Sequence, residues 1–139
     1  MKVLLDTNVV LDAVACREPF RKEAEQIVML AANEALDCYI TANTITDIYY
    51  ITRKYFSDAI TRDKLRYLFT VFSVLDLYAA DCENAINFPL PDYEDAILAL
   101  CAQKNGVDYI ITRDGDFLDH AGTLPVISPK GFLDTFMKL

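Results

Sequence analysis

The hydrophobic residues of this chain form two kinds of pattern that alternate along its length. Short apolar runs, typical of strands buried in a sheet, occupy residues 2–5, 38–40, 73–77, 107–112 and 124–128. Stretches with helical periodicity occupy residues 20–34, about 41–54, about 57–72, 81–87, 92–106 and a segment that begins at 129, and a polar loop is expected over 113–122. Strands that alternate with helices predict an α/β fold, in which helices cover both faces of a parallel sheet.

Residues that start and stop helices agree with this division. Pro19 suits a first helical turn, and Thr41 or Asn43 suits the N-cap of the next helix. Asp92 opens an apolar helix, which Gly106 ends at a C′ position. The helix boundaries therefore follow from local residues as well as from periodicity.

The composition predicts a folded protein with no membrane anchor. The chain has 139 residues, of which 53 % are hydrophobic, and we expect a single domain over residues 1–139. No apolar run reaches the roughly 18 residues that a membrane span requires. No secretory leader is recognisable, so we expect a cytoplasmic protein. The four cysteines have no CxxC spacing, and we expect them to be buried, reduced thiols.

The charge is acidic and unevenly distributed between residue types. The formal net charge is -8, and aspartate outnumbers glutamate fifteen to six. Aspartate is a poor helix and strand former, so a surplus of it is typical of caps, turns and metal sites. An acidic chain binds nucleic acid only through a local basic patch or through a metal that bridges carboxylates and phosphates.

Carboxylates follow two of the predicted strands at the point where each one ends. Asp6 comes directly after residues 2–5, and Asp114 and Asp116 come after residues 107–112. Ligands of parallel α/β sheets bind outside the carboxyl ends of the strands. If these two strands are neighbours, their ends lie about 5 Å apart. We therefore expect these carboxylates to face one crevice.

Three further aspartates suit either a site or a structural role. Asp92 and Asp95 are three residues apart and share one face of their helix, where Asp92 suits an N-cap and Asp95 abuts a buried stretch. Asp47 lies in an otherwise apolar helix. It completes a capping box if Thr44 is the N-cap, and it has no such local role if the cap is Thr41.

Structural roles compete with function at the strand ends as well. Asp114 suits an Asp-Gly turn, and Asp116 suits the cap of a short helix over residues 117–120. Asn8 suits an ordinary helix cap, and His120, the single histidine, suits a solvated loop. None of these residues identifies a site by itself.

Carboxylates that converge in one crevice repel each other unless a cation lies between them. Mg²⁺ and Mn²⁺ prefer oxygen ligands of this kind, and the sequence offers no competing set of soft ligands. The pattern therefore predicts a site for Mg²⁺ or Mn²⁺ at the carboxyl ends of the strands.

Four segments resemble the acidic motifs of PIN domains, in the order and at about the spacing of that family. They are DTNVVLD at 6–12, TANTITDIYYI at 41–51, DYEDAILALCA at 92–102 and ITRDGDF at 111–117. The resemblance covers essentially the whole chain, and its first and last motifs are the most specific.

The resemblance implies a three-layer α-β-α sandwich with a parallel five-strand sheet of order 3-2-1-4-5. It implies a nuclease that uses Mg²⁺ or Mn²⁺ to hydrolyse phosphodiester bonds of single-stranded RNA. Four aspartates match the catalytic positions: Asp6, Asp47, Asp95 and Asp114. Metal binding falls to Asp6, Asp95, Asp114 and Asp116, and positions that orient these carboxylates match Asn8, Thr112 and Asp92.

The resemblance also implies partners. Many small PIN proteins are VapC-type toxins held inactive by a small antitoxin, so RNA and an antitoxin are the expected partners, and we expect a homodimer. Arg113 lies beside the site and is a candidate to bind the substrate backbone. Further cations are interleaved with tyrosines over residues 49–67. Those aromatic residues stack on bases, belong to the core, or form a dimer or antitoxin interface.

One residue departs from the family pattern and leaves alternatives open. The second motif usually carries glutamate, whereas this chain has Asp47, which is one methylene shorter. A PIN fold that has lost activity and binds RNA or protein is therefore an alternative to the enzyme. A phosphatase of the haloacid-dehalogenase type is a further alternative, because its DxD motif resembles Asp6 and Asn8. Asparagine, however, cannot act as the general acid of that motif.

Overall fold

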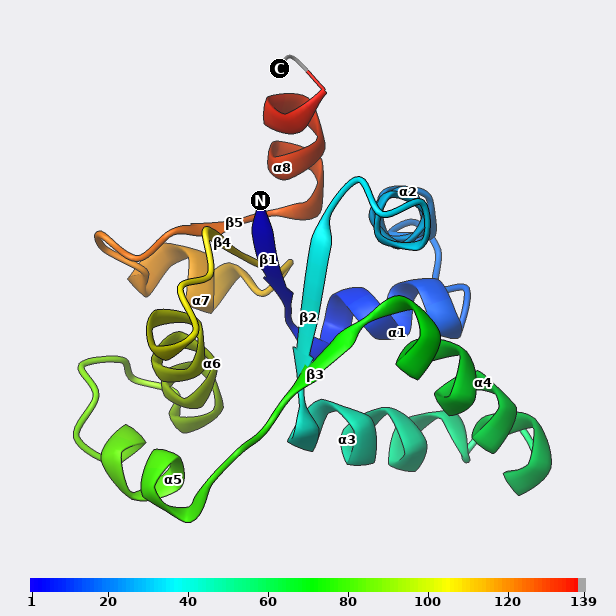
Figure 1. The fold of residues 1–139 in the computed structure, drawn as a ribbon, viewed down its shortest axis with the longest axis horizontal. Coiled ribbons are helices and arrows are strands. Elements are labelled where there is room, and N and C mark those ends of the chain that lie inside the picture. Colours follow the sequence, from blue (N-terminus) through cyan, green and yellow to red (C-terminus); the bar gives the residue numbers. More distant parts are fainter. Residues whose placement is uncertain (138–139) are drawn as a thin grey trace.

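The computed structural model describes residues 1–137 and arranges them in three layers (Figure 1). Five parallel strands form the central sheet in the order β3-β2-β1-β4-β5, which confirms the predicted fold. The strands are β1 (Lys2–Leu5), β2 (Asp37–Thr41), β3 (Ser73–Leu75), β4 (Tyr109–Ile111) and β5 (Val126–Ile127). The helices are α1 (Thr7–Val14), α2 (Arg21–Ala32), α3 (Ala42–Thr52), α4 (Asp58–Val71), α5 (Ala79–Ala85), α6 (Tyr93–Lys104), α7 (Gly115–His120) and α8 (Pro129–Phe136).

Alternation along the strands divides the core between the two helical layers. Val3 and Leu5 of β1 pack into a cluster with residues of α1 to α4 and α8. Leu4, which points to the opposite face, packs with Phe117 of α7 and with residues of α6. In Figure 1, α5, α6 and α7 accordingly lie on one side of the sheet, and α1 to α4 lie on the other. Burial of each such side chain stabilises the fold by about 1.5–3 kcal/mol.

The pairing of β1 with β4 brings the predicted site residues together. Leu5 lies opposite Ile111 in the parallel register, and the Asp6 N–H donates to the Ile111 carbonyl at 2.9 Å. Asp6 follows Leu5 and Thr112 follows Ile111, so these two residues lie next to each other at the ends of β1 and β4. The sheet edge beyond them is the place where a parallel α/β fold binds its ligands.

One helix occurs where the sequence pattern did not predict it, and another begins earlier than predicted. Residues 7–14 form α1, although the sequence analysis assigned no element there. Its run VVLDAV is apolar except for Asp12 because α1 is buried between the sheet and other helices, and such a run carries no clear period. The loop expected over 113–122 contains α7, which begins at Gly115. The expected short helix over 117–120 is present, but it begins two residues earlier, at Gly115, and its N-cap is Asp114 rather than Asp116.

The predicted helix starts were right in part. Thr41 is the N-cap of α3, and Asp92 is the N-cap of α6. Gly106 follows the C-cap of α6 with φ +65°, a backbone conformation that favours glycine. Pro19 was not in the first turn of α2, because Phe20 is the N-cap and the helix begins at Arg21.

Other boundaries moved by a few residues. β3, β4 and β5 are shorter than the runs predicted over 73–77, 107–112 and 124–128, because flanking apolar residues pack without ladder pairing. α5 begins at Ala79 rather than at residue 81. Asp81 is its third residue and accepts the Tyr78 N–H at 2.9 Å.

The cysteine and membrane expectations have separate outcomes. Cys38 and Cys101 are buried thiols, Cys82 is half-buried, and Cys16 is exposed, against expectation. Cys16 lies at the turn after α1, where its side chain points away from the core. Within residues 1–137, no helix has the length and apolar character needed to cross a membrane.

Candidate active site

Asp6 is held in place by a hydrogen-bond network at the end of β1. It is the N-cap of α1, and its Oδ1 accepts the Thr7 N–H at 2.7 Å. Its Oδ2 accepts the Thr112 hydroxyl at 2.8 Å and the Asn8 side-chain amide at 3.3 Å. Burial raises the pKa of the Asp6 carboxyl above its ordinary value, and the Thr112 hydrogen bond opposes that rise.

Asn8 and Thr112 join the ends of β1 and β4. The Asn8 amide donates to Thr112 Oγ1 at 3.2 Å, and Asn8 Oδ1 accepts the Arg113 N–H at 3.3 Å. Thr112 Oγ1 also accepts the Asp114 N–H at 3.1 Å. Both side chains are thus placed where the sequence predicted residues that orient carboxylates. The side-chain amide of Asn8 donates a hydrogen bond to Asp6, and an amide cannot act as the general acid that a haloacid-dehalogenase phosphatase requires.

Three aspartates around this edge are helix N-caps, and each uses one carboxylate oxygen for that purpose. Asp92 Oδ1 accepts the Asp95 N–H at 3.0 Å, and Asp114 Oδ1 accepts the Asp116 N–H at 3.0 Å. Asp6 Oδ1 caps α1 in the same way. The cap fixes the orientation of each side chain and leaves the second oxygen for another partner.

The charges of Asp6, Asp92 and Asp114 all act on the carboxyl group of Asp95. Its side chain is buried in the first turn of α6, with the residue 8 % exposed. Burial, followed by the charges of Asp92, Asp6 and Asp114, raises the pKa of Asp95 to about 7. A carboxyl with such a pKa marks a place where like charges converge without a cation, and such places are candidates for functional sites.

A cavity of about 350 Å³ opens beside these residues. Its lining consists of Leu90, Pro91, Asp92, Asp95, Asp114, Asp116 and His120. The structure thus brings together Asp6, Asp114 and Asp116, as predicted from the strand ends, with Asp92 and Asp95 of α6 next to them. His120 was expected in a solvated loop. It is exposed, but it ends α7 on the cavity wall. The sequence suggested a short helix over 117–120 but not where that helix lies, so only the structure places His120 on the cavity wall.

Asp47 is set apart from the other carboxylates. It lies half-buried in α3 and does not line the cavity, and burial alone raises its pKa. The capping-box interpretation fails because Thr41 is the N-cap and Thr44 lies inside the helix. Glu94, which the sequence analysis did not single out, lies between the two groups. Burial raises its pKa first, and the charges of Asp47, Asp92 and Asp6 raise it further.

Arg113 points away from the cavity. Its guanidinium binds Asp12 through two hydrogen bonds of 2.6 and 3.1 Å and lies 3.9 Å from the centre of the Phe20 ring. Asp12 is 1 % exposed and also pairs with Arg17 at 2.9 Å. The sequence analysis did not identify this partner, because Asp12 is hidden within an apolar run.

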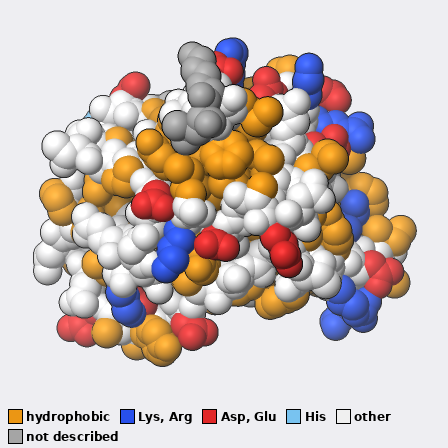
Figure 2. Space-filling model, turned by 45° about the horizontal axis from the view of Figure 1, so that its top comes forward, with side chains coloured by type: hydrophobic (Ala, Val, Ile, Leu, Met, Phe, Trp, Pro, Cys, Tyr) orange, Lys and Arg blue, Asp and Glu red, His pale blue; other side chains and the backbone are white. Residues whose placement is uncertain are grey.

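The cations over residues 49–67 are engaged as well. Arg62 pairs with Asp58 at 2.8 Å, and Arg66 pairs with Asp63. Lys64 Nζ donates to the Val14 carbonyl at 3.0 Å. On the face shown in Figure 2, acidic and basic side chains are interspersed, and no continuous basic stripe crosses that face. A bridging metal thus remains the stronger route to a phosphate.

The donor set of the cavity fits a hard divalent cation. Four carboxylates line it, Asp6 adjoins it, and no lysine or arginine is among its lining residues. Within residues 1–137, no three carboxylate, imidazole or thiol side chains are already close enough together to hold an ion. Binding would therefore draw the carboxylates inward and replace their mutual repulsion by attraction to the cation.

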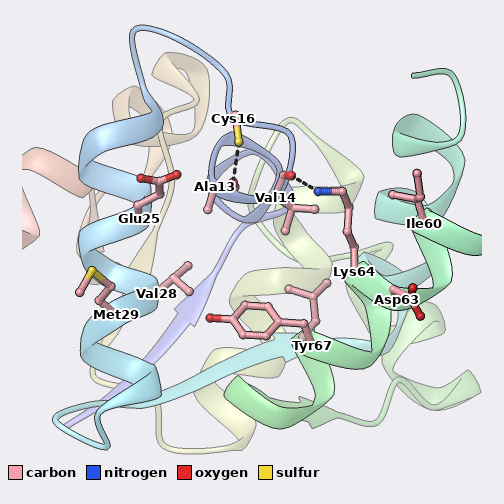
Figure 3. Close-up of a pocket in the computed structure, with 11 residues that line it drawn as sticks. Ala13, Val14, Cys16, Glu25, Val28, Met29, Ile60, Asp63, Lys64 and Tyr67 are labelled. Carbon is pink, nitrogen blue, oxygen red and sulfur yellow. Dashed lines mark hydrogen bonds between the residues drawn. The ribbon is translucent and has the colours of Figure 1, made fainter. Parts of the chain in front are cut away.

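A larger cavity lies away from the carboxylates, between α2, α4 and the end of α1 (Figure 3). Its volume is about 570 Å³. Val28 and Met29 of α2 and Ile60 and Tyr67 of α4 line it, and Figure 3 shows them on its two sides. Glu25, Asp63 and Lys64 also line it, but most of its lining is apolar and suits a hydrophobic partner rather than a phosphodiester.

Comparison with known sequences finds a family match over most of the chain. The sequence model of the PIN domain family matches residues 2–116. Ribonuclease VapC1 from Aquifex aeolicus (strain VF5) is 22 % identical over 143 residues, which cover 99 % of this chain and 97 % of that protein.

Comparison with solved structures agrees with the fold. A toxin-antitoxin complex from Klebsiella pneumoniae contains a chain that is 26 % identical, with a TM-score of 0.66 and coverage of 91 % of this chain and 97 % of that one. VapC20 from Mycobacterium tuberculosis, a toxin that cleaves the sarcin-ricin loop, is 15 % identical with a TM-score of 0.68. The match covers 88 % of this chain and 95 % of VapC20.

Proposed function

Because this chain belongs to the PIN domain family, we propose that it is a metal-dependent endoribonuclease that hydrolyses phosphodiester bonds in single-stranded RNA. The observation that carries the proposal is the gathering of Asp92, Asp95, Asp114 and Asp116 around one cavity beside Asp6. The similarity to Ribonuclease VapC1 along the full chain supports it. A haloacid-dehalogenase phosphatase is not consistent with the family match or with Asn8.

We assign the cation, Mg²⁺ or Mn²⁺, to Asp6, Asp95, Asp114 and Asp116. A divalent cation in such a site makes water a stronger nucleophile at neutral pH and offsets the charge of the scissile phosphate. Asn8 and Thr112 hold Asp6 in one orientation. The caps at Asp92 and Asp114 fix the first turns of α6 and α7, which carry Asp95 and Asp116.

Asp47 is not needed to form this cavity. Because it does not line the cavity, two roles are to be tested, a contact through water with the cation or a contact with the RNA strand. The alternative is a PIN fold that binds RNA or protein without cleaving it. Calorimetric titration with Mn²⁺ separates the two functions, because the enzyme needs a metal and the binding module does not.

The experiment that tests the proposal is incubation of labelled single-stranded RNA with the purified protein and Mn²⁺ or Mg²⁺. We expect defined fragments in either metal and none in EDTA. Double-stranded RNA of the same sequence is the matched substrate, and we expect it to remain intact. Fragments that persist in EDTA would contradict a metal-dependent mechanism, and intact RNA in every metal would favour the binding module.

We further propose that the chain is the toxin of a toxin-antitoxin pair. Structures with this fold include toxin-antitoxin complexes from Klebsiella pneumoniae and Rickettsia felis. The apolar cavity in Figure 3 is the surface we assign to an antitoxin segment with hydrophobic side chains. Exposed Met29 and Ile60, at 61 % and 48 %, would become buried on binding.

Replacement of Met29 by aspartate is expected to weaken binding of the antitoxin roughly 30-fold, because the charge would be buried against an apolar partner. The candidate antitoxin is the protein encoded by the reading frame next to that of this chain. Ile86→Asp is the matched control, since Ile86 is 69 % exposed and lies outside this cavity. Calorimetry of each variant with the candidate measures the difference. An equal loss in both variants, or none in either, would place the antitoxin elsewhere.

A further inference from the structure

His120 is fixed on the wall of the acidic cavity by the helix that carries it. α7 is anchored at its start by the Asp114 cap and in its middle by Phe117, which is 1 % exposed. His120 is the last residue of this helix, one turn after Asp116. Its ring joins Asp92, Asp95, Asp114 and Asp116 in the lining of the cavity, and among residues 1–137 no other nitrogen-bearing side chain lines it.

A hydrogen bond fixes which nitrogen of the His120 ring is free. Nδ1 lies 2.8 Å from the backbone carbonyl of Asp116. A carbonyl oxygen only accepts hydrogen bonds, so Nδ1 carries the hydrogen whether the ring is neutral or protonated. Nε2 is therefore the atom that is left to meet a ligand. It accepts a hydrogen bond in the neutral ring and donates one in the protonated ring.

An RNA strand offers this nitrogen two kinds of group. Phosphate oxygens only accept hydrogen bonds, so they bind Nε2 only when the ring is protonated. The ribose 2′-hydroxyl both donates and accepts, so it binds Nε2 in either state of the ring. The hydroxyl is uncharged, and the carboxylates of the cavity do not repel it. The 2′-hydroxyl is also the group that distinguishes RNA from DNA.

We propose that His120 hydrogen-bonds the 2′-hydroxyl of a nucleotide bound beside the acidic cavity and thereby makes the site selective for RNA. This inference rests on the proposed ribonuclease function and adds a specificity residue to it. His120 holds the substrate and takes no part in bond cleavage. We therefore expect His120 to change the preference between substrates and not the rate of the chemical step.

The test compares an RNA strand that the protein cleaves with strands that carry a single 2′-deoxy substitution at each nucleotide near the cleavage point. Each pair of strands competes in one reaction with Mn²⁺, which gives the ratio of their kcat/KM values. A loss of folded protein does not change this ratio, because the same molecules cut both strands. For the wild type we expect one deoxy position to lower kcat/KM roughly two- to tenfold.

The variant His120→Ala is expected to lose this preference, so that the deoxy strand and the RNA strand are cut equally well. His120→Gln is expected to restore part of it, because its amide also donates and accepts hydrogen bonds. Asp119→Ala removes an exposed side chain from the same turn of α7 and is expected to keep the full preference.

An unchanged ratio in His120→Ala would overturn the role of His120 while leaving the ribonuclease function intact. A preference lost equally in Asp119→Ala would also overturn it, since the cause would then be α7 as a whole. Failure of the wild type to cleave any strand would overturn the proposed function, and this inference with it.

Discussion

The Asp95→Asn variant is expected to cleave single-stranded RNA about a thousandfold more slowly than the wild type. Asp95 lies between Asp6, Asp92 and Asp114, and its carboxylate is the one on which their charges act together. The amide has nearly the same shape but no charge, so it binds a divalent cation weakly. Initial rates on labelled RNA in Mn²⁺, with EDTA as the blank, measure the loss.

The same substitution is expected to stabilise the protein in the absence of metal. The pKa of Asp95 is about 7 in the folded state, against an ordinary value of 3.8. The folded state therefore binds the proton more tightly than the unfolded state does. The resulting stability is fully present below about pH 4 and is lost as the pH rises through about 7. In EDTA, we expect the wild type to become more stable as the pH falls from about 8.5 to 5.5.

At pH 8 the asparagine variant avoids this loss, and we expect its free energy of unfolding to exceed that of the wild type by about 2 kcal/mol. Urea titration at the two pH values measures the difference. Asp119→Asn is the control, because Asp119 is exposed on α7 outside the cavity, and it should change neither activity nor stability. A variant that keeps its activity would show that Asp95 is outside the active site. One that loses activity because it is unfolded would contradict the stabilisation.

The sequence was sufficient to predict that these carboxylates converge, because the carboxyl ends of parallel strands lie at the same edge of a sheet. Asp6 and Asp114 follow strands that pair directly, so their positions in the sequence were sufficient to bring them together. The strand order came from the family resemblance. Periodicity alone does not say that β1 lies between β2 and β4.

At several positions, a capping role and a functional role are compatible with each other. Asp6, Asp92 and Asp114 each cap a helix with one oxygen, and they also face the same edge of the sheet. Because the helices of a parallel α/β fold begin where its strands end, capping carboxylates gather at the ligand-binding edge. A capping signal at such a position therefore does not count against a site.

The residues that the sequence could not place depend on helices without a clear period. His120 was expected in a solvated loop because the position of the short helix over 117–120 was unknown, and Asp12 had no predicted role because α1 was not predicted. α7 is short and polar, whereas α1 is apolar on nearly every side because it is buried. Glu94 illustrates a different limit, since its relation to Asp47 depends on how α3 and α6 approach each other.

Replacement of Arg113 by glutamine is expected to lower the free energy of unfolding by about 3 kcal/mol, because it leaves the Asp12 carboxylate buried with one cationic partner instead of two. The expectation follows from geometry. Asp12 is 1 % exposed, and Arg113 supplies both a bidentate pair and a guanidinium stacked on Phe20. Arg17→Gln is the matched control and should cost much less, since Arg17 makes a single hydrogen bond to Asp12.

The double variant Asp12→Asn/Arg113→Gln shows whether the loss comes from the buried charge. We expect it to be more stable than Arg113→Gln alone, because the uncompensated carboxylate is then absent. RNA cleavage by Arg113→Gln, measured where the variant is folded, is expected to be nearly unchanged, since the guanidinium points away from the acidic cavity. The role in substrate binding that the sequence suggested for Arg113 requires the opposite outcome, a weakened affinity for RNA in a variant of normal stability. If that outcome were found, the guanidinium would have to leave Asp12 when RNA binds, and Asp12→Asn would then increase the affinity for RNA by freeing it.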